Sequence, residues 1–184
     1  AALAQFHGPV EGLHRLRLVG AQSAGFALAQ VGVGDGDGCQ RLALGPDSFG
    51  VEIAANDGYL LKNFVAAGIP CLGIEPTAST AAAAEALGIP VLREFFGEAL
   101  GHRLAAQGRQ ADLIIGNNVY AHVPDINDFT RGIKAALKPG GTLTLEFPHL
   151  LRLLEHAQFD TVYHEHFSYL SLHTVSRIFE AAGL

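Results

Sequence analysis

Apolar residues recur in short blocks from Phe49 onward, and the blocks alternate between two kinds. One kind is a continuous apolar run that ends in a turn, which is typical of a buried strand. The other kind has apolar residues three and four positions apart and ends near glycine or proline, which is typical of a helix. The predicted strands cover 49–55, 71–76, 91–92, 111–118 and 142–147, and the predicted helices cover 59–67, 79–87, 97–107 and 125–137.

Strands that alternate with helices of this length indicate an α/β fold with a doubly wound, mostly parallel sheet of the Rossmann-like kind. Helices on both faces of such a sheet explain why the strands are apolar throughout. A tight turn at 138–141 is expected to lead from the last predicted helix into the last strand. Before Phe49 neither period persists, and the stretch 31–40 is rich in glycine, so that region is expected to be loosely structured.

Composition narrows the class of protein. The 184 residues are 49% apolar and 16% charged, which fits one globular domain. A formal charge of −6 argues against a nucleic-acid surface. Cys39 and Cys71 are the only cysteines, so a disulfide scaffold and a four-cysteine zinc site are excluded. Methionine is absent and residue 1 is alanine, so we expect a piece of a longer protein.

The sequence lacks the two patterns that would indicate a membrane or secreted location. No apolar run reaches the roughly 18 residues that a membrane helix needs, and no signal-peptide pattern opens the chain. We therefore expect a cytoplasmic domain that contacts neither a membrane nor nucleic acid.

In an open α/β sheet, ligands bind beyond the carboxyl ends of the strands, where the strand order reverses. Three predicted loops meet this condition, at 55–58, 75–76 and 116–119. Glu75 lies 18 positions after Asp57, close to the spacing expected between a first turn and a ribose-binding carboxylate. A surface glutamate at a strand end is the alternative interpretation.

The first turn lacks the glycines of a dinucleotide fingerprint, because only Gly58 is present. Asp57 at this turn would also repel a phosphate. A ligand with a cationic centre and no phosphate fits better, which favours S-adenosylmethionine over NAD.

A histidine-rich segment runs from Tyr163 to Phe167, and Tyr169 and His173 follow it. Three interpretations stay open: a metal site made of His164, His166 and His173, histidines hydrogen-bonded in a packed loop, or a general base oriented by its neighbours. His149, just beyond the last predicted strand, is a further candidate for the same crevice.

Six motifs carry a family resemblance: VEIAANDGYLL (51–61), GIEP (73–76), FFG (95–97), NNVYAHVPDINDF (117–129), LKPGGTLTLEFPHLL (137–151) and FDTVYHEHFSYLSL (159–172). In this order they resemble the class I S-adenosylmethionine methyltransferases that C-methylate nucleotide sugars, in particular 3-C-methyltransferases of dTDP-4-keto-deoxysugars. The resemblance covers 42–184, which it implies to be the S-adenosylmethionine-binding domain. Residues 1–41 do not match and form a poorly defined segment.

The resemblance also assigns roles to single residues. It implies that the base and its helpers are Tyr163, Glu165 and His166, with His166 removing the proton. It implies contacts to the cofactor from Ala55, Asn56, Asp57, Gly58, Tyr59, Leu60, Glu75, Pro76, Asn117, Asn118, Val119 and His122. No metal is expected in this part of the chain, because the zinc module of the family is absent, as is the carboxyl-terminal domain that helps bind the sugar.

The implied reaction is transfer of a methyl group to C3 of a nucleotide-linked 4-keto-deoxysugar through an enolate. The ketone at C4 acidifies the proton on C3, and a base is needed to remove it. Two alternatives stay open: another small-molecule S-adenosylmethionine methyltransferase, or a cofactor-binding fragment without catalysis. The nucleotide sugar is the expected partner, and the sequence leaves the oligomeric state open, a monomer included.

Overall fold

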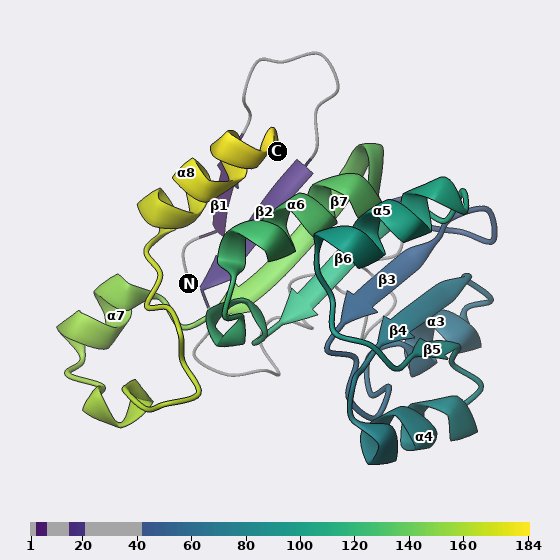
Figure 1. The fold of residues 1–184 in the computed structure, drawn as a ribbon, viewed down its shortest axis with the longest axis horizontal. Helices are drawn as coiled ribbons and strands as arrows, with labels where there is room; N and C mark the ends of the chain where they lie inside the picture. The colour runs from purple at the N-terminus through teal and green to yellow at the C-terminus, as the bar shows by residue number, and fades with distance from the viewer. Residues whose placement is uncertain (1–2, 7–14, 21–41) are drawn as a thin grey trace.

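Strands and helices alternate along the chain, as the apolar pattern predicts (Figure 1). A computed structural model describes residues 3–6, 15–20 and 42–184. The strands are β1 (Leu3–Phe6), β2 (Arg15–Gly20), β3 (Gly50–Ile53), β4 (Cys71–Ile74), β5 (Val91–Leu92), β6 (Ala111–Asn117) and β7 (Leu137–Phe147). The helices are α3 (Lys62–Ala66), α4 (Ala78–Ala86), α5 (Glu98–Ala106), α6 (Ile126–Ala136), α7 (Leu150–Glu155) and α8 (Leu172–Ala182), with short 3-10 helices η1 (Tyr120–His122) and η2 (Phe159–Thr161).

The described strands form one sheet in the order β1-β2-β7-β6-β3-β4-β5. All neighbouring pairs are parallel except β1 with β2. The chain runs outward from β3 to β5 and then returns to the other side of β3 with β6, so the strand order reverses between β3 and β6. The predicted doubly wound, mostly parallel sheet is therefore confirmed, and the crevice rule points to the carboxyl ends of these two strands.

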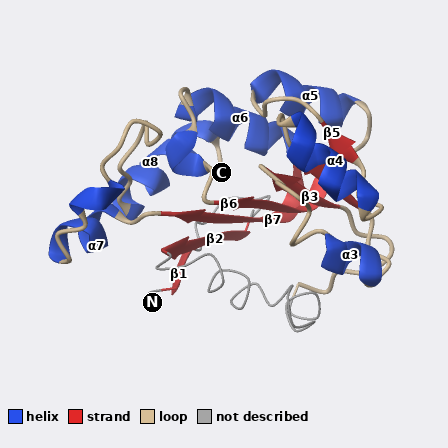
Figure 2. Cartoon of the chain, turned by 90° about the horizontal axis from the view of Figure 1, so that it is seen from below, coloured by secondary structure: helices blue, strands red, loops and turns tan. Residues whose placement is uncertain are grey.

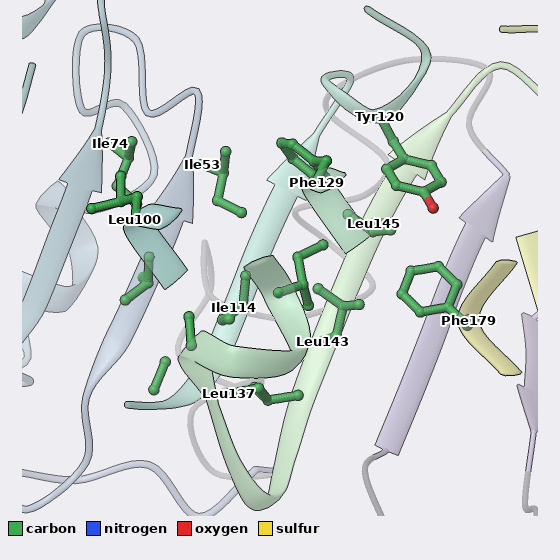
Figure 3. Close-up of a cluster of buried hydrophobic side chains, with 14 of the residues drawn as sticks. Ile53, Ile74, Leu100, Ile114, Tyr120, Phe129, Leu137, Leu143, Leu145 and Phe179 are labelled. Atoms are coloured by element: carbon green, nitrogen blue, oxygen red, sulfur yellow. The ribbon is translucent and has the colours of Figure 1, made fainter. Parts of the chain in front are cut away.

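Two apolar clusters cover the two faces of this sheet. Helices α5, α6 and α8 pack on one face, above the sheet in Figure 2, over a cluster that includes Val51, Ile114 and Leu143. Figure 3 shows this cluster, in which the Tyr120 ring packs against the rings of Phe129 and Phe179. Helices α3 and α4 contribute to the opposite cluster, which includes Leu113 and Ile115.

Helices α5 and α6 approach each other unusually closely, because glycines line their contact. A Cβ atom on Gly101 would lie 2.2 Å from the carbonyl oxygen of Gly132, and one on Gly132 would lie 2.5 Å from that of Gly97. Contacts this short are not tolerated by real side chains, so the close crossing requires glycine. The first turn of α6 is in addition capped by Asp125, whose carboxylate accepts from the backbone amides of Asn127 and Asp128.

The predicted tight turn at 138–141 is wrong in form, because these residues belong to β7. Ala111 pairs with Leu137, but Leu113 already pairs with Thr142, so the segment between them bulges out of the sheet. Gly140 supplies the positive φ of 78° that the bulge needs. Helix α3 also starts later than predicted. A separate turn precedes it, in which the Lys62 amide donates to the Gly58 carbonyl.

Two regions differ from the sequence expectation by having more structure. Strands β1 and β2 fall in a stretch for which no element was predicted, and the other residues of 1–41 lie outside the described part. After β7 the chain forms α7, η2 and α8, and α7 with the loop behind it extends beyond the sheet (Figure 1). Strand β7 is also not apolar throughout, because Thr142, Thr144 and Glu146 alternate with its apolar residues.

Candidate functional site

The turn after β3 has a tightly specified backbone. Ala54 and Asn56 adopt positive φ angles of 58° and 49°, which non-glycine residues rarely do. The Asn56 side chain donates to the Ala54 carbonyl (3.2 Å), and the Asp57 carboxylate accepts from the Tyr59 amide (3.2 Å). Gly58 has a φ of 78°, and a Cβ there would lie 2.3 Å from Ile89. The positive φ and the contact with the buried Ile89 side chain together explain why position 58 requires glycine.

Glu75, at the end of β4, is 4% exposed, which excludes the interpretation as a surface residue. Its two carboxylate oxygens accept from the backbone amides of Asn56 (3.1 Å) and Thr77 (2.8 Å). An ionised carboxylate has about four acceptor positions, so both oxygens retain room for a second donor. Glu75 therefore ties the turn after β3 to the end of β4 and is still able to hold two hydroxyl groups.

Other residues predicted at the cofactor have different surroundings. Ala55 and Leu60 are buried in the apolar cluster to which α3 and α4 contribute, so only their backbone groups can contact a ligand. The Tyr59 ring is 61% exposed and lies against the Lys62 ammonium at 4.3 Å. Pro76 is half-buried directly after Glu75.

The end of β6 lies beside the turn, because β3 and β6 are neighbours in the sheet. Asn117 is half-buried, and Asn118 has a φ of 49° while its amide donates to the Glu146 carbonyl at 3.0 Å. Val119 packs against the apolar cluster that lies between the sheet and helices α5, α6 and α8. The chain then enters η1, where buried Tyr120 donates to the Thr130 hydroxyl (2.7 Å) because that hydroxyl donates to the Ile126 carbonyl.

The structure brings His122 of η1 together with the histidine-rich segment. The His122 and His166 rings lie 4.6 Å apart between centroids, and the Tyr163 ring lies 4.5 Å from that of His166. Glu165 contacts this group of rings through its backbone, because its carbonyl oxygen lies 3.1 Å from Nδ1 of His122. Tyr163 and Glu165 are exposed, whereas His166 is half-buried.

The hydrogen bonds of His166 fix which ring nitrogen is free. Nδ1 lies 2.8 Å from the Thr161 carbonyl, which can only accept, so Nδ1 carries the hydrogen. In the neutral ring the lone pair is then on Nε2, which is the arrangement that a general base needs. The same argument places the lone pair of His122 on Nε2, because its Nδ1 faces the Glu165 carbonyl.

The segment that carries His166 is held at its tip and at its base. At the tip, the amides of Phe167 and Ser168 donate to the Ala121 carbonyl (2.9 and 3.2 Å). At the base, His149 accepts the Leu172 amide through Nε2 (3.2 Å), and the Leu150 amide donates to the Leu170 carbonyl. His149, a crevice candidate from the sequence, thus fastens the start of α8.

Glu52, which is buried in β3 just before the turn, is a residue for which the sequence predicts no role. Burial, and then the charge of Asp57, raise the pKa of this carboxyl from 4.5 to about 8. One of its oxygens has no hydrogen-bond partner within the described residues. The available signal was an acid inside an otherwise apolar strand.

The residues present fit S-adenosylmethionine, because a buried acid, a turn with a tightly specified backbone and a second strand end meet at one sheet edge. For metals the outcome differs: among residues 3–6, 15–20 and 42–184, no group of three or more His, Cys, Asp or Glu side chains could hold an ion. His164, His166 and His173 therefore form no such cluster. No helix in the described part of the chain is long and apolar enough to span a bilayer.

Comparison with known proteins agrees with this geometry. The profile of a family described as "Methyltransferase domain" matches residues 36–184. C-methyltransferase NovU of Streptomyces niveus is 36% identical over 145 residues, which cover 79% of this chain. The chain spans only 34% of the length of NovU.

Solved structures share the fold at low sequence identity. A SAM-dependent methyltransferase from Archaeoglobus fulgidus superposes with a TM-score of 0.64 at 13% identity, covering 88% of this chain and 69% of its own. The YcgJ protein of Bacillus subtilis gives 0.64 at 14% identity, covering 86% and 68%. The fold, the site geometry and the family profile agree, and the chain belongs to the family of S-adenosylmethionine-dependent methyltransferase domains.

Proposed function

We propose that this chain is the donor-binding domain of a C-methyltransferase that acts on C3 of a nucleotide-linked 4-keto-deoxysugar, with His166 as the base. The observation that carries the proposal is the bond of His166 Nδ1 to the Thr161 carbonyl, which leaves Nε2 as the proton acceptor. Carbon-directed methylation needs such a base, because a C–H bond next to a ketone is a weak acid. The name of NovU, a C-methyltransferase, supports the same reaction class.

Donor binding and proton removal are carried out by different residues at the same edge of the sheet. The turn 55–58 and Glu75 bind the donor, with the free acceptor positions of Glu75 directed to the ribose hydroxyls. S-adenosylmethionine, when bound, supplies a methyl group on a positively charged sulfur. Holding donor and sugar in line supplies a large part of the acceleration.

The proton follows a defined route in this proposal. Nε2 of His166 takes the proton from C3 of the sugar, and the electron pair of that C–H bond moves into the C4 ketone to give an enolate with its negative charge on the C4 oxygen. The Thr161 carbonyl then accepts a stronger hydrogen bond from the imidazolium and so stabilises its charge. Tyr163, whose ring contacts that of His166, orients the base, and its exposed side chain is available to the sugar.

Hydrogen exchange at the sugar tests this base directly. In D₂O, with S-adenosylhomocysteine in place of the donor, the chain is expected to exchange the C3 proton of a dTDP-4-keto-deoxysugar, as followed by NMR. His166→Asn should slow the exchange by about 100-fold or more, with unchanged affinity for S-adenosylhomocysteine. His156→Asn, at an exposed histidine, is the matched control. Exchange that proceeds equally in His166→Asn would exclude this base.

A further inference from the structure

The chain between β7 and α8 carries the candidate base and leaves the sheet as one long connection (Figure 1). This β7–α8 connection (residues 150–171) contains α7, η2 and His166. Its side chains are buried only at Leu153 and Leu170. A segment with few buried apolar contacts opens at a low free-energy cost. The hydrogen bonds that close the connection therefore decide how firmly His166 is held.

Two hydrogen bonds close the neck of this connection, which is the place where its two ends meet. The Leu150 amide donates to the Leu170 carbonyl at 2.8 Å, beside a parallel pairing of His149 with Leu170. The Leu172 amide donates to Nε2 of His149 at 3.2 Å. The second bond is the one that depends on a side chain, and this side chain can take up a proton.

His149 supplies an acceptor that the start of α8 needs. The Leu172 amide is the first amide of α8, so it has no acceptor inside the helix. His149 provides that acceptor, and the Ser171 hydroxyl accepts from the Thr174 amide of the same turn. The His149 carbonyl in addition accepts from the Leu153 amide in α7. His149 thus joins the chain that leaves β7 to the first turns of two helices.

The bond to Leu172 requires the neutral form of His149. An amide can only donate, so Nε2 supplies its lone pair and the ring hydrogen is on Nδ1. A proton on Nε2 removes this acceptor, and the resulting imidazolium lies at the positive end of the α8 dipole. Both effects weaken the neck as the pH falls.

The charged groups near the neck leave the His149 ring without an ion pair in the described part of the chain. Arg152 and Glu155 of α7 are exposed and pair with each other at 2.6 Å. His173 in the first turn of α8 is exposed. Burial raises the pKa of Glu146, near the end of β7, which favours its uncharged form. A proton on His149 therefore meets no compensating contact from these groups.

We propose that His149 is a positioning residue for the base: its neutral ring closes the neck and so holds His166 in the orientation for proton removal. The inference rests on the proposed function, because His149 acts through His166 and does not contact the reacting atoms. The tip of the connection is held separately, on the Ala121 carbonyl. Loss of the neck bond therefore loosens the connection and leaves the donor-binding turn 55–58 in place.

Two substitutions separate the acceptor from the titration. In His149→Gln, Oε1 is as many bonds from the backbone as Nε2 of histidine, so the variant keeps an acceptor that does not titrate. In His149→Asn the acceptor is one bond shorter and does not reach the Leu172 amide. Hydrogen exchange of this amide at pH 8, measured by NMR, should be about 3- to 10-fold faster in His149→Asn, the effect of one lost hydrogen bond. His149→Gln should match the unaltered chain.

Lowering the pH from 8 to 5 covers the range in which histidines titrate. After correction for the intrinsic rate, the Leu172 amide of the unaltered chain should lose protection by about 3- to 10-fold, whereas His149→Gln should show no change. His173→Gln, at an exposed histidine of α8, and His166→Asn should both keep the response. Equal exchange in the two His149 variants at pH 8, or a response that persists in His149→Gln, overturns the proposal. If His149→Asn does not fold by circular dichroism, the comparison of His149→Gln with the unaltered chain decides.

Exchange of the sugar C3 proton, at a saturating concentration of a dTDP-4-keto-deoxysugar, measures the effect on the base. At pH 8 it should be about 3- to 10-fold slower in His149→Asn and restored in His149→Gln, with unchanged affinity for S-adenosylhomocysteine in both. Unchanged C3 exchange in His149→Asn, or lost affinity for S-adenosylhomocysteine, overturns the positioning role. Absence of C3 exchange in the unaltered chain overturns the proposed function, whereas the Leu172 measurement still decides whether His149 closes the neck.

Discussion

Replacing Glu52 by Gln is expected to remove a large part of the pH dependence of stability. The folded chain raises the pKa of Glu52 from 4.5 to about 8, mainly by burial. Below pH 4.5 the carboxyl is protonated in both the folded and the unfolded states, and the contribution of the neutral buried group to stability is fully present. Between pH 4.5 and about pH 8 the unfolded chain releases this proton and the folded chain keeps it. Stability therefore falls as the pH rises through this window.

The size of this loss follows from the shift in pKa. Each unit corresponds to about 1.4 kcal/mol, so the free energy of unfolding should fall by at most about 5 kcal/mol between roughly pH 5 and pH 8. Glutamine has nearly the same shape and does not titrate. Relative to the unaltered chain, Glu52→Gln should thus gain stability steadily as the pH rises. Some dependence remains, because burial raises the pKa of Glu146 as well.

Urea unfolding at one-unit pH intervals, followed by circular dichroism, measures this difference. Asp47→Asn, which removes an exposed acid outside the sheet, serves as the matched control. Parallel stability curves for Glu52→Gln and the unaltered chain would show that Glu52 is ionised in the fold. That result would refute the reasoning from burial.

Two further variants test the packing that positions the site. Gly132→Ala should lower stability by about 1–3 kcal/mol despite the better helix propensity of alanine, because its Cβ would lie 2.5 Å from the Gly97 carbonyl oxygen. Gly45→Ala meets nothing within 4 Å and is the control in thermal unfolding; equal melting temperatures would contradict the close crossing. Asp125→Ala should cost about 1 kcal/mol through the lost cap of α6, whereas Asp125→Asn should retain most of it. Equal stability of these two variants in urea would show that the cap contributes nothing.

The sequence predicts the alternation of elements well because both periods are strong from Phe49 onward. It also places Glu75 at a strand end by spacing alone. It misses the bulge at 138–141, since a Lys-Pro-Gly-Gly stretch has the composition of a free turn. Only the pairing of Leu137 with Ala111 shows that the strand has already begun.

The burial of polar side chains on β7 could not be predicted from the sequence either. The alternation TLTLEF is visible in residues 142–147, but half-buried strands with a solvated face show the same pattern. Burial of Thr144 and Glu146 depends on what covers that face. The pairing of His122 with His166 joins positions 44 residues apart and depends on the path of the loop after β7.

The attachment of the His166 segment has a consequence for how substrate preference can change among related enzymes. Its tip is fastened by backbone amides on the Ala121 carbonyl, and His166 itself is oriented by the backbone of Thr161. Main-chain atoms are common to all residues, so the anchoring is insensitive to most substitutions in the segment. The exposed side chains of Phe159, Val162 and Phe167 can therefore be exchanged while the imidazole keeps its orientation. Selection for a different substrate can act on these three positions without changing the orientation of the His166 ring.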